Sequence, residues 1–82
     1  LVEQTAKKLG DDYDIEIFDA HHRHKVDAPS GTALALGHAA AAGRGVKLED
    51  AMIAARSGHI GARPVGAIGM SVFRGGDVIG DH

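Results

Sequence analysis

The residues best suited to chemistry form a short cluster, in which three histidines and a lysine fall within five positions: His21, His22, His24 and Lys25. Imidazole has an ordinary pKa close to neutrality, and an ammonium group donates protons and binds anions. In an extended segment His21 and Lys25 would lie about 13 Å apart, at ~3.3 Å per residue. The cluster therefore predicts acid–base chemistry on one small molecule only if the chain turns here. The alternative is a row of solvated side chains at the end of a strand.

A second candidate site opens the next segment, Pro29-Ser30-Gly31-Thr32. Ser30 is a favourable N-cap residue, and the alanine-rich run after it predicts a helix. The free N–H groups and the positive dipole end of a helix attract anions. Gly31 would let a ligand approach the backbone, and the Thr32 hydroxyl adds a hydrogen-bond donor. The alternative is a plain N-cap, but the short distance along the chain from Lys25 favours a joint site for an anionic ligand.

A third candidate is the glycine-rich segment Ser57–Arg63, which contains two side chains that could touch a ligand. We interpret both, His59 and Arg63, as solvated loop residues. No Gly-x-Gly-x-x-Gly sequence occurs in the chain, so the dinucleotide-binding fingerprint is missing from it.

A metal centre is a weaker interpretation of the histidine cluster. His21 and His22 are neighbours on an expected strand, and neighbours on a strand point to opposite faces. Zinc sites usually need a fourth ligand, and the sequence contains no cysteine. The sequence therefore predicts no metal site.

The elements that must position these residues can be read from the hydrophobic pattern. Apolar residues spaced by four and three predict a helix over Val2–Leu9, ended by Gly10. Alternating residues predict a half-buried strand over Tyr13–His21 that leads directly into the histidine cluster. Asp27–Pro29 must be a loop, and a helix is expected from about Ser30 to Ala42, ended by Gly43.

The second half of the chain predicts a long loop followed by a hairpin. Ala51–Arg56 is an apolar run of uncertain type, and Ser57–Gly66 is typical of a loop. Ala67–Arg74 is expected to be a strand, with a tight turn over Gly75–Asp77 and a returning strand over Val78–Gly80. Together these elements predict an α+β domain with a mixed β-sheet.

The composition excludes several classes of protein. With 82 residues, 24% of them charged and a net charge of −2, the chain is neither a disordered charged tail nor a general nucleic-acid binder. It has no apolar run of the length of a membrane span, and the lack of cysteine suits a reducing compartment. Because Leu1 already lies in helical sequence without a cap, we expect a piece of a longer protein, truncated at both ends.

The run from Ile15 to Ala33 resembles the signature of the 4-hydroxy-tetrahydrodipicolinate reductases, also called dihydrodipicolinate reductases, of the diaminopimelate route to lysine. The core of the resemblance is His-His-x-x-Lys-x-Asp-Ala-Pro-Ser-Gly-Thr, which is long and specific. The similarity continues through the Ser57–Arg63 segment and Arg74–His82. Asp19 stands where the family usually has Glu, and we expect this change to be tolerated because the acidic group is kept.

The resemblance implies an α+β fold, a mixed β-sheet with helices packed on one face. Residues 1–82 would form a single partial domain for substrate binding, catalysis and oligomerisation, and the N-terminal Rossmann domain of the family would be absent. NADPH or NADH would deliver hydride to a cyclic imine dicarboxylate, giving tetrahydrodipicolinate. The resemblance further implies a cytoplasmic homotetramer with no nucleic-acid or membrane partner.

The resemblance also assigns roles to the two candidate clusters. His21 would be the family's proton donor/acceptor, and Lys25 its proton donor. The residues expected to hold the substrate are His22, Ser30, Gly31 and Thr32. Without a cofactor domain the chain alone should be inactive. A rival interpretation is a non-catalytic oligomerisation or anion-binding domain.

Overall fold

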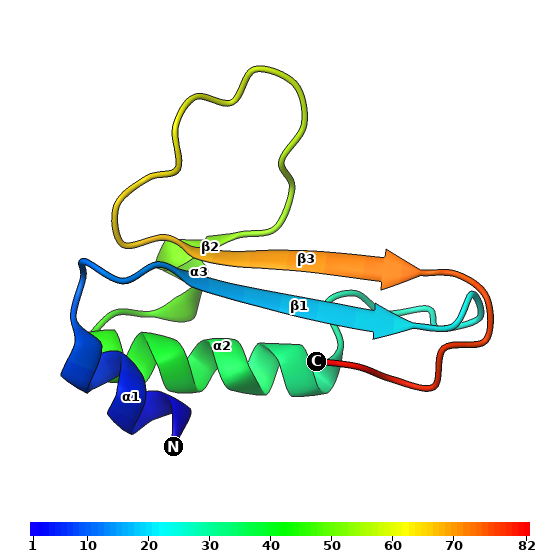
Figure 1. Cartoon of the computed structure of the whole chain (residues 1–82), viewed down its shortest axis with the longest axis horizontal. Helices are drawn as coiled ribbons and strands as arrows, with labels where there is room; N and C mark the ends of the chain where they lie inside the picture. The colour runs from blue at the N-terminus through cyan, green and yellow to red at the C-terminus, as the bar shows by residue number, and fades with distance from the viewer.

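The computed structural model describes residues 1–82 and has two layers, helices on one side and a small sheet on the other (Figure 1). The elements follow in the order α1 (Val2–Leu9), β1 (Ile15–His21), α2 (Gly31–Arg44), α3 (Leu48–Ala51), β2 (Met52–Ile53) and β3 (Ile68–Arg74). Helix α2 runs along one face of the sheet, and α1 packs against α2. None of the helices has the length and apolar composition needed to cross a membrane.

The sheet has the strand order β1-β3-β2, and both pairs of neighbours are parallel. The predicted α+β fold with helices on one face is confirmed. The sequence predicts a sheet with both parallel and antiparallel pairing. The antiparallel pairing is limited to one isolated bridge, between Ala20 and Asp81. The register pairs Ile15 with Ile68 and His21 with Arg74, so β1 and β3 end together at the same edge.

The predicted hairpin after β3 is wrong. Residues 78–80 form no strand beside β3, although a turn occurs at residues 76–77 as expected. The tail instead crosses to β1, where Asp81 exchanges two 2.9 Å backbone hydrogen bonds with Ala20. It is held there by a contact of His82 with Ser30, at the start of α2, which the local turn sequence does not encode.

Helix α2 begins as predicted and ends later than predicted. The Ser30 side chain caps it by accepting a hydrogen bond from the Ala33 amide at 3.1 Å. The helix ends at Gly45, which adopts the left-handed conformation with φ 69°, and not at Gly43. Gly43 lies inside the helix, where a Cβ atom would collide with the Glu3 carbonyl of α1. Its role is therefore to allow the two helices to approach closely.

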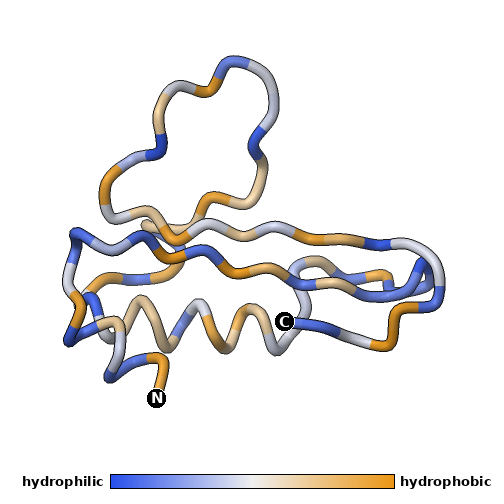
Figure 2. The backbone as a smooth tube through the Cα atoms, viewed as in Figure 1, coloured by the Kyte–Doolittle hydropathy of each residue, from blue (hydrophilic) through white to orange (hydrophobic).

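The core between the helices and the sheet is small and contains several alanines. Inward and outward positions alternate from Ile15 to Asp19 along β1, as the sequence predicts, although the exposed Phe18 is apolar and the buried Asp19 is charged. Figure 2 shows hydrophilic and hydrophobic residues close together along this strand. Gly37 of α2 packs against the side chains of Met70 and Leu48. A Cβ atom at Gly37 would lie 2.7 Å from the Met70 methyl group, so a side chain there would have to displace its neighbours. The buried cluster consists of Ile17, Ala33, Ala40, Ala41, Leu48, Ile68 and Met70.

The long loop between β2 and β3 projects from the sheet and is fastened to it by two arginines (Figure 1). Arg56 and Arg63 both bind the carboxylate of Glu16, at 2.8–2.9 Å. Arg63 also donates to the carbonyls of Ile15 and Ala67. The interpretation of Arg63 as a solvated residue is therefore wrong, whereas His59 is exposed as expected.

These contacts make the loop attachment sensitive to acid. Hydrogen bonding from Arg56, and then from Arg63, outweighs the opposing effect of burial and lowers the pKa of Glu16 to about 2. Gly69 of β3 makes room for this carboxylate, because a Cβ atom there would collide with it.

We expect Glu16→Gln to destabilise the chain near neutral pH, because partly exposed ion pairs contribute about 0.2–1 kcal/mol each. A carboxyl whose pKa is lowered on folding stabilises the protein above its unfolded value, here 4.5, and loses that effect as the pH falls toward about 2. Urea denaturation between pH 6 and pH 3 should therefore show the variant approaching the wild type on acidification. Glu49→Gln, which removes an acid without an ion pair, is the control. A stability difference that stays constant over this range would contradict the assignment.

Candidate functional site

A buried carboxylate occupies the end of β1 where the two predicted clusters meet. Asp19 is only 1% exposed, on the strand face that carries Ile15 and Ile17. Its Oδ2 atom accepts hydrogen bonds from the Ser30 amide at 2.7 Å and from Arg74 Nη2 at 3.1 Å. Its Oδ1 atom accepts one from Arg74 Nη1 at 3.2 Å and also contacts His21. Residues of β1, β3 and the α2 cap are thus joined through one side chain.

These partners determine the charge of Asp19. Burial alone would disfavour the ionised carboxylate and raise its pKa. The hydrogen bonds from Arg74, the Ser30 amide and His21, together with the charge of Arg74, outweigh burial and hold the pKa of Asp19 well below its usual range. Asp19 is therefore an anion at neutral pH, balanced by the guanidinium.

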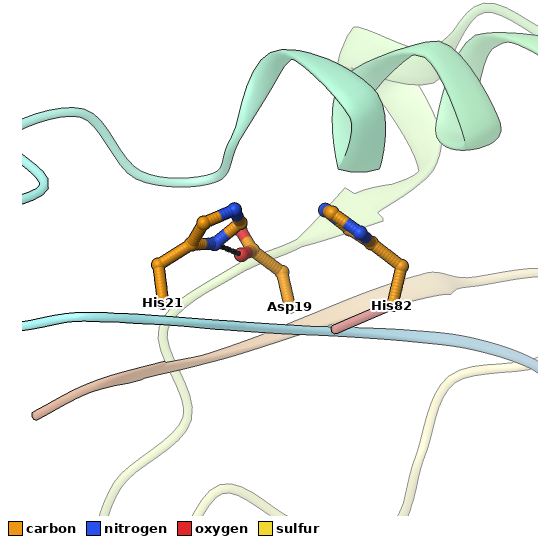
Figure 3. Close-up of side chains that lie close together, drawn as sticks. All are labelled: Asp19, His21 and His82. Carbon is orange, nitrogen blue, oxygen red and sulfur yellow. Dashed lines mark hydrogen bonds and ion pairs between the residues drawn. The ribbon is translucent and has the colours of Figure 1, made fainter. Parts of the chain in front are cut away.

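His21 lies at the last position of β1, with its side chain 13% exposed. Figure 3 shows its Nδ1 atom directed at the Asp19 carboxylate, while the rest of the ring lies on the side facing α2. The ring stands edge-on to that of His82, with centroids 5.2 Å apart. The imidazole is thus held by a charged partner on one side and remains partly accessible to solvent.

Ser30 joins the start of α2 to the tail of the chain. Its amide donates to Asp19, and its Oγ atom accepts from the Ala33 amide and lies 2.9 Å from His82 Nε2. Gly31 and Thr32, which follow it, are exposed, and their amides have no acceptor within the chain. A Cβ atom at Gly31 would meet nothing within 4 Å, so the backbone is open to solvent here.

The turn required by the histidine cluster is present. The Lys25 amide donates to the His22 carbonyl at 3.2 Å, which closes the turn directly after β1. The Lys25 ammonium binds Asp27 Oδ1 at 2.9 Å and takes no part in the Asp19 contacts. The His22 ring accepts from the His24 amide and borders an open depression of about 680 Å³, which is also lined by Arg23, His24, Gly76, Asp77 and Ile79.

The structure therefore brings together His21, Ser30 and the free amides of Gly31 and Thr32, at one edge of the sheet. It places His22 beside this group and Lys25 on its margin, paired with Asp27.

The whole chain matches a known protein family. The family described as "Dihydrodipicolinate reductase, C-terminus" matches residues 1–82. The chain belongs to this family.

Individual relatives agree with the family match. The chain is 60% identical over 83 residues to "4-hydroxy-tetrahydrodipicolinate reductase 1" of Mesorhizobium japonicum. It is 61% and 62% identical over 82 residues to proteins named "4-hydroxy-tetrahydrodipicolinate reductase" from Dinoroseobacter shibae and Parvibaculum lavamentivorans. All of the chain is covered in each case, but it spans only about 30% of the length of these relatives.

Three residues of the site were not predicted from the sequence: Asp19, Arg74 and His82. One signal for Asp19 was available, because it continues the alternation of Ile15 and Ile17 and so falls on the face directed at the core. A charged residue at such a position needs a buried partner. The identity of that partner depends on strand register and could not be deduced locally.

The contacts of Asp19 argue against a metal ion at this end of β1. Ligand atoms of Asp19, His21 and His82 lie within 4.8 Å of one another. Both carboxylate oxygens, however, already accept hydrogen bonds from Arg74. A metal cation at this place would be repelled by the positive charge of the Arg74 guanidinium. The Asp19 carboxylate is therefore suited to accept hydrogen bonds and not to bind a metal ion.

Proposed function

We propose that this chain supplies the substrate-binding and proton-transfer part of an NAD(P)H-dependent 4-hydroxy-tetrahydrodipicolinate reductase. The observation that carries the proposal is that Asp19 joins His21 to the capped start of α2, which puts an imidazole beside free backbone amides. Membership of the dihydrodipicolinate reductase family supports the same assignment. The product would be tetrahydrodipicolinate, an intermediate of lysine and diaminopimelate biosynthesis.

The nicotinamide cofactor does not fit the residues of this chain. A dinucleotide site needs a glycine-rich turn between a strand and a helix. The connection from β1 to α2 is instead the histidine-rich turn and its proline loop. We therefore assign NADPH or NADH to the part of the relatives that this chain does not match.

The substrate would bind through its carboxylates at the start of α2. The free amides of Gly31 and Thr32 and the positive end of a 14-residue helix attract a carboxylate. Ser30 would orient this turn, and the Thr32 hydroxyl and His22 ring would add hydrogen bonds. Charge-assisted hydrogen bonds of this kind are roughly twice as strong as neutral ones.

Reduction of a cyclic imine adds a hydride to carbon and a proton to nitrogen. We assign the transfer of this proton to His21, as the donor and acceptor, and to Lys25, as a second donor. Lys25 follows the turn that starts at His22, so its long side chain remains at the same edge of the sheet. It would exchange its contact with Asp27 for the substrate.

A homotetramer is the oligomeric state that we infer for the intact protein. Phe18 and Phe73 lie on neighbouring strands, on the face of the sheet directed away from the helices, and about half of each is exposed. This observation also favours the second candidate function, a domain that only assembles subunits or binds anions.

Kinetics can separate the two functions in a chimera, in which this chain replaces the matching segment of the Mesorhizobium japonicum relative. His21→Ala or Lys25→Ala should mainly lower kcat, by about 10²–10⁴-fold, because such groups contribute this much as acids and bases. Thr32→Val should mainly raise KM, because it removes a hydrogen bond that holds the substrate in the ground state.

The unsubstituted chimera and His59→Ala, which changes an exposed histidine of the long loop, are the controls. If His21→Ala keeps turnover within about threefold of the chimera, the catalytic assignment is wrong and the assembly function is favoured.

The anion site can be tested in the chain alone with pyridine-2,6-dicarboxylate, a planar dicarboxylate. In an NMR titration the backbone amide shifts should be centred on residues 22–32, because that is where the free amides and the histidine turn lie. A Thr32→Val variant should bind more weakly. If the largest shifts fall on residues 57–63 instead, the site has been misplaced and Ser30 only caps the helix.

A further inference from the structure

The imidazole of His21 is fixed through only one of its nitrogens. Nδ1 contacts Asp19, whereas the other ring nitrogen, Nε2, points toward the start of α2 (Figure 3). On the side of the tail, the neighbour of this ring is Gly80, which has no side chain to displace it. A Cβ atom at Gly80 would lie 3.0 Å from Nε2. Nε2 has no hydrogen-bond partner within the chain and the side chain is 13% exposed, so Nε2 is the nitrogen left for a ligand.

The partner of Nδ1 can only accept a hydrogen bond. An ionised carboxylate has no proton to give, so a hydrogen bond between Asp19 and a neutral imidazole requires the proton to be on Nδ1. The charged and titratable groups around His21 come from three places in the fold: Asp19 on β1, Arg74 on β3 and His82 in the tail.

Arg74 cannot easily turn away from Asp19. Its Nη1 and Nη2 atoms both donate to the carboxylate, and they also donate to the carbonyls of Phe73 at 2.8 Å and Asp27 at 3.0 Å. The Ser30 amide provides a further fixed donor at 2.7 Å. These donors leave Asp19 in one orientation, and they favour its anion over the protonated acid.

We propose that Asp19 is a positioning residue, which keeps neutral His21 in the Nδ1–H tautomer and so makes Nε2 the nitrogen that exchanges protons with the substrate. In this arrangement protonated His21 gives up the Nε2 proton and becomes neutral, while the Nδ1 proton stays on the bond to Asp19. Arg74 keeps Asp19 from taking that proton. This inference rests on the proposed role of His21 in the reaction.

The tautomer can be measured in the wild-type chain without any assay of activity. Nitrogen-15 NMR of the histidine rings, at a pH where they are neutral, distinguishes a protonated ring nitrogen from an accepting one. The expected result for His21 is a protonated Nδ1 and an accepting Nε2. The opposite tautomer, or an equal mixture of the two, would overturn the proposal while leaving the proposed function untouched.

Substitutions at Asp19, in the chimera described above, test the consequence for the reaction. In Asp19→Asn the amide can donate to Nδ1 and select the wrong tautomer. We expect kcat to fall by about 10²–10⁴-fold with little change in KM. Asp19→Glu keeps an accepting carboxylate and should restore both the Nδ1–H tautomer and most of kcat.

Glu16→Gln is the matched control, because Glu16 lies on the same strand and is also paired with arginines, but on the opposite face. It should leave both the tautomer and kcat unchanged. A folded Asp19→Asn variant with unchanged kcat, or one that loses kcat with the Nδ1–H tautomer intact, would refute the positioning role. If Asp19→Asn does not fold, the wild-type tautomer decides the question.

Discussion

The ion pair between Asp19 and Arg74 is the interaction on which the arrangement of this domain depends. A buried carboxylate is costly unless it is paired and hydrogen-bonded, and here its partners come from elements that are distant in sequence. Removing one partner of a buried pair typically costs about 3–5 kcal/mol, because an unpaired charge remains. The pair therefore favours the one packing in which β1, β3 and the start of α2 meet.

The rest of the fold makes this meeting possible. The parallel register of β1 and β3 places Arg74 at the same edge as His21, close enough to Asp19 for two hydrogen bonds. Gly43 allows α1 to pack closely against α2 near its end, and small residues along α2 allow it to lie close to the sheet. In this way a thin core still fixes the first turn of α2, which is the turn with free amides.

The sequence was informative wherever the determining contacts are local. The alternation along β1 and the cap at Ser30 depend on neighbouring residues, and both were predicted. The turn after His21 was only a condition for joint chemistry of the histidine cluster, and the structure contains it. The two clusters were expected to form a joint site because only a short loop separates them, and the structure joins His21 and Ser30 through Asp19.

The sequence was uninformative where the contacts are distant. Two partners of Asp19, Ser30 and Arg74, lie 11 and 55 residues away, so no local pattern could reveal them. The glycine-rich sequence after β3 predicted a reversal of the chain, but it did not determine the strand against which the tail packs. The tail pairs with β1 and not with β3. Gly43 has the residue type of a helix end, yet its small size serves a contact with α1 that only the tertiary structure reveals.

The central claim is that one ionised carboxylate joins the start of α2 to the sheet. NMR couplings across hydrogen bonds, which correlate a donor nitrogen with the carbon of its acceptor, test this claim most directly. The structure predicts a correlation between the Ser30 amide nitrogen and the Asp19 side-chain carboxylate carbon, and none for the amides of Gly31 and Thr32. A Ser30 amide that correlates with a backbone carbonyl, or with no acceptor while it exchanges freely with solvent, would contradict the account.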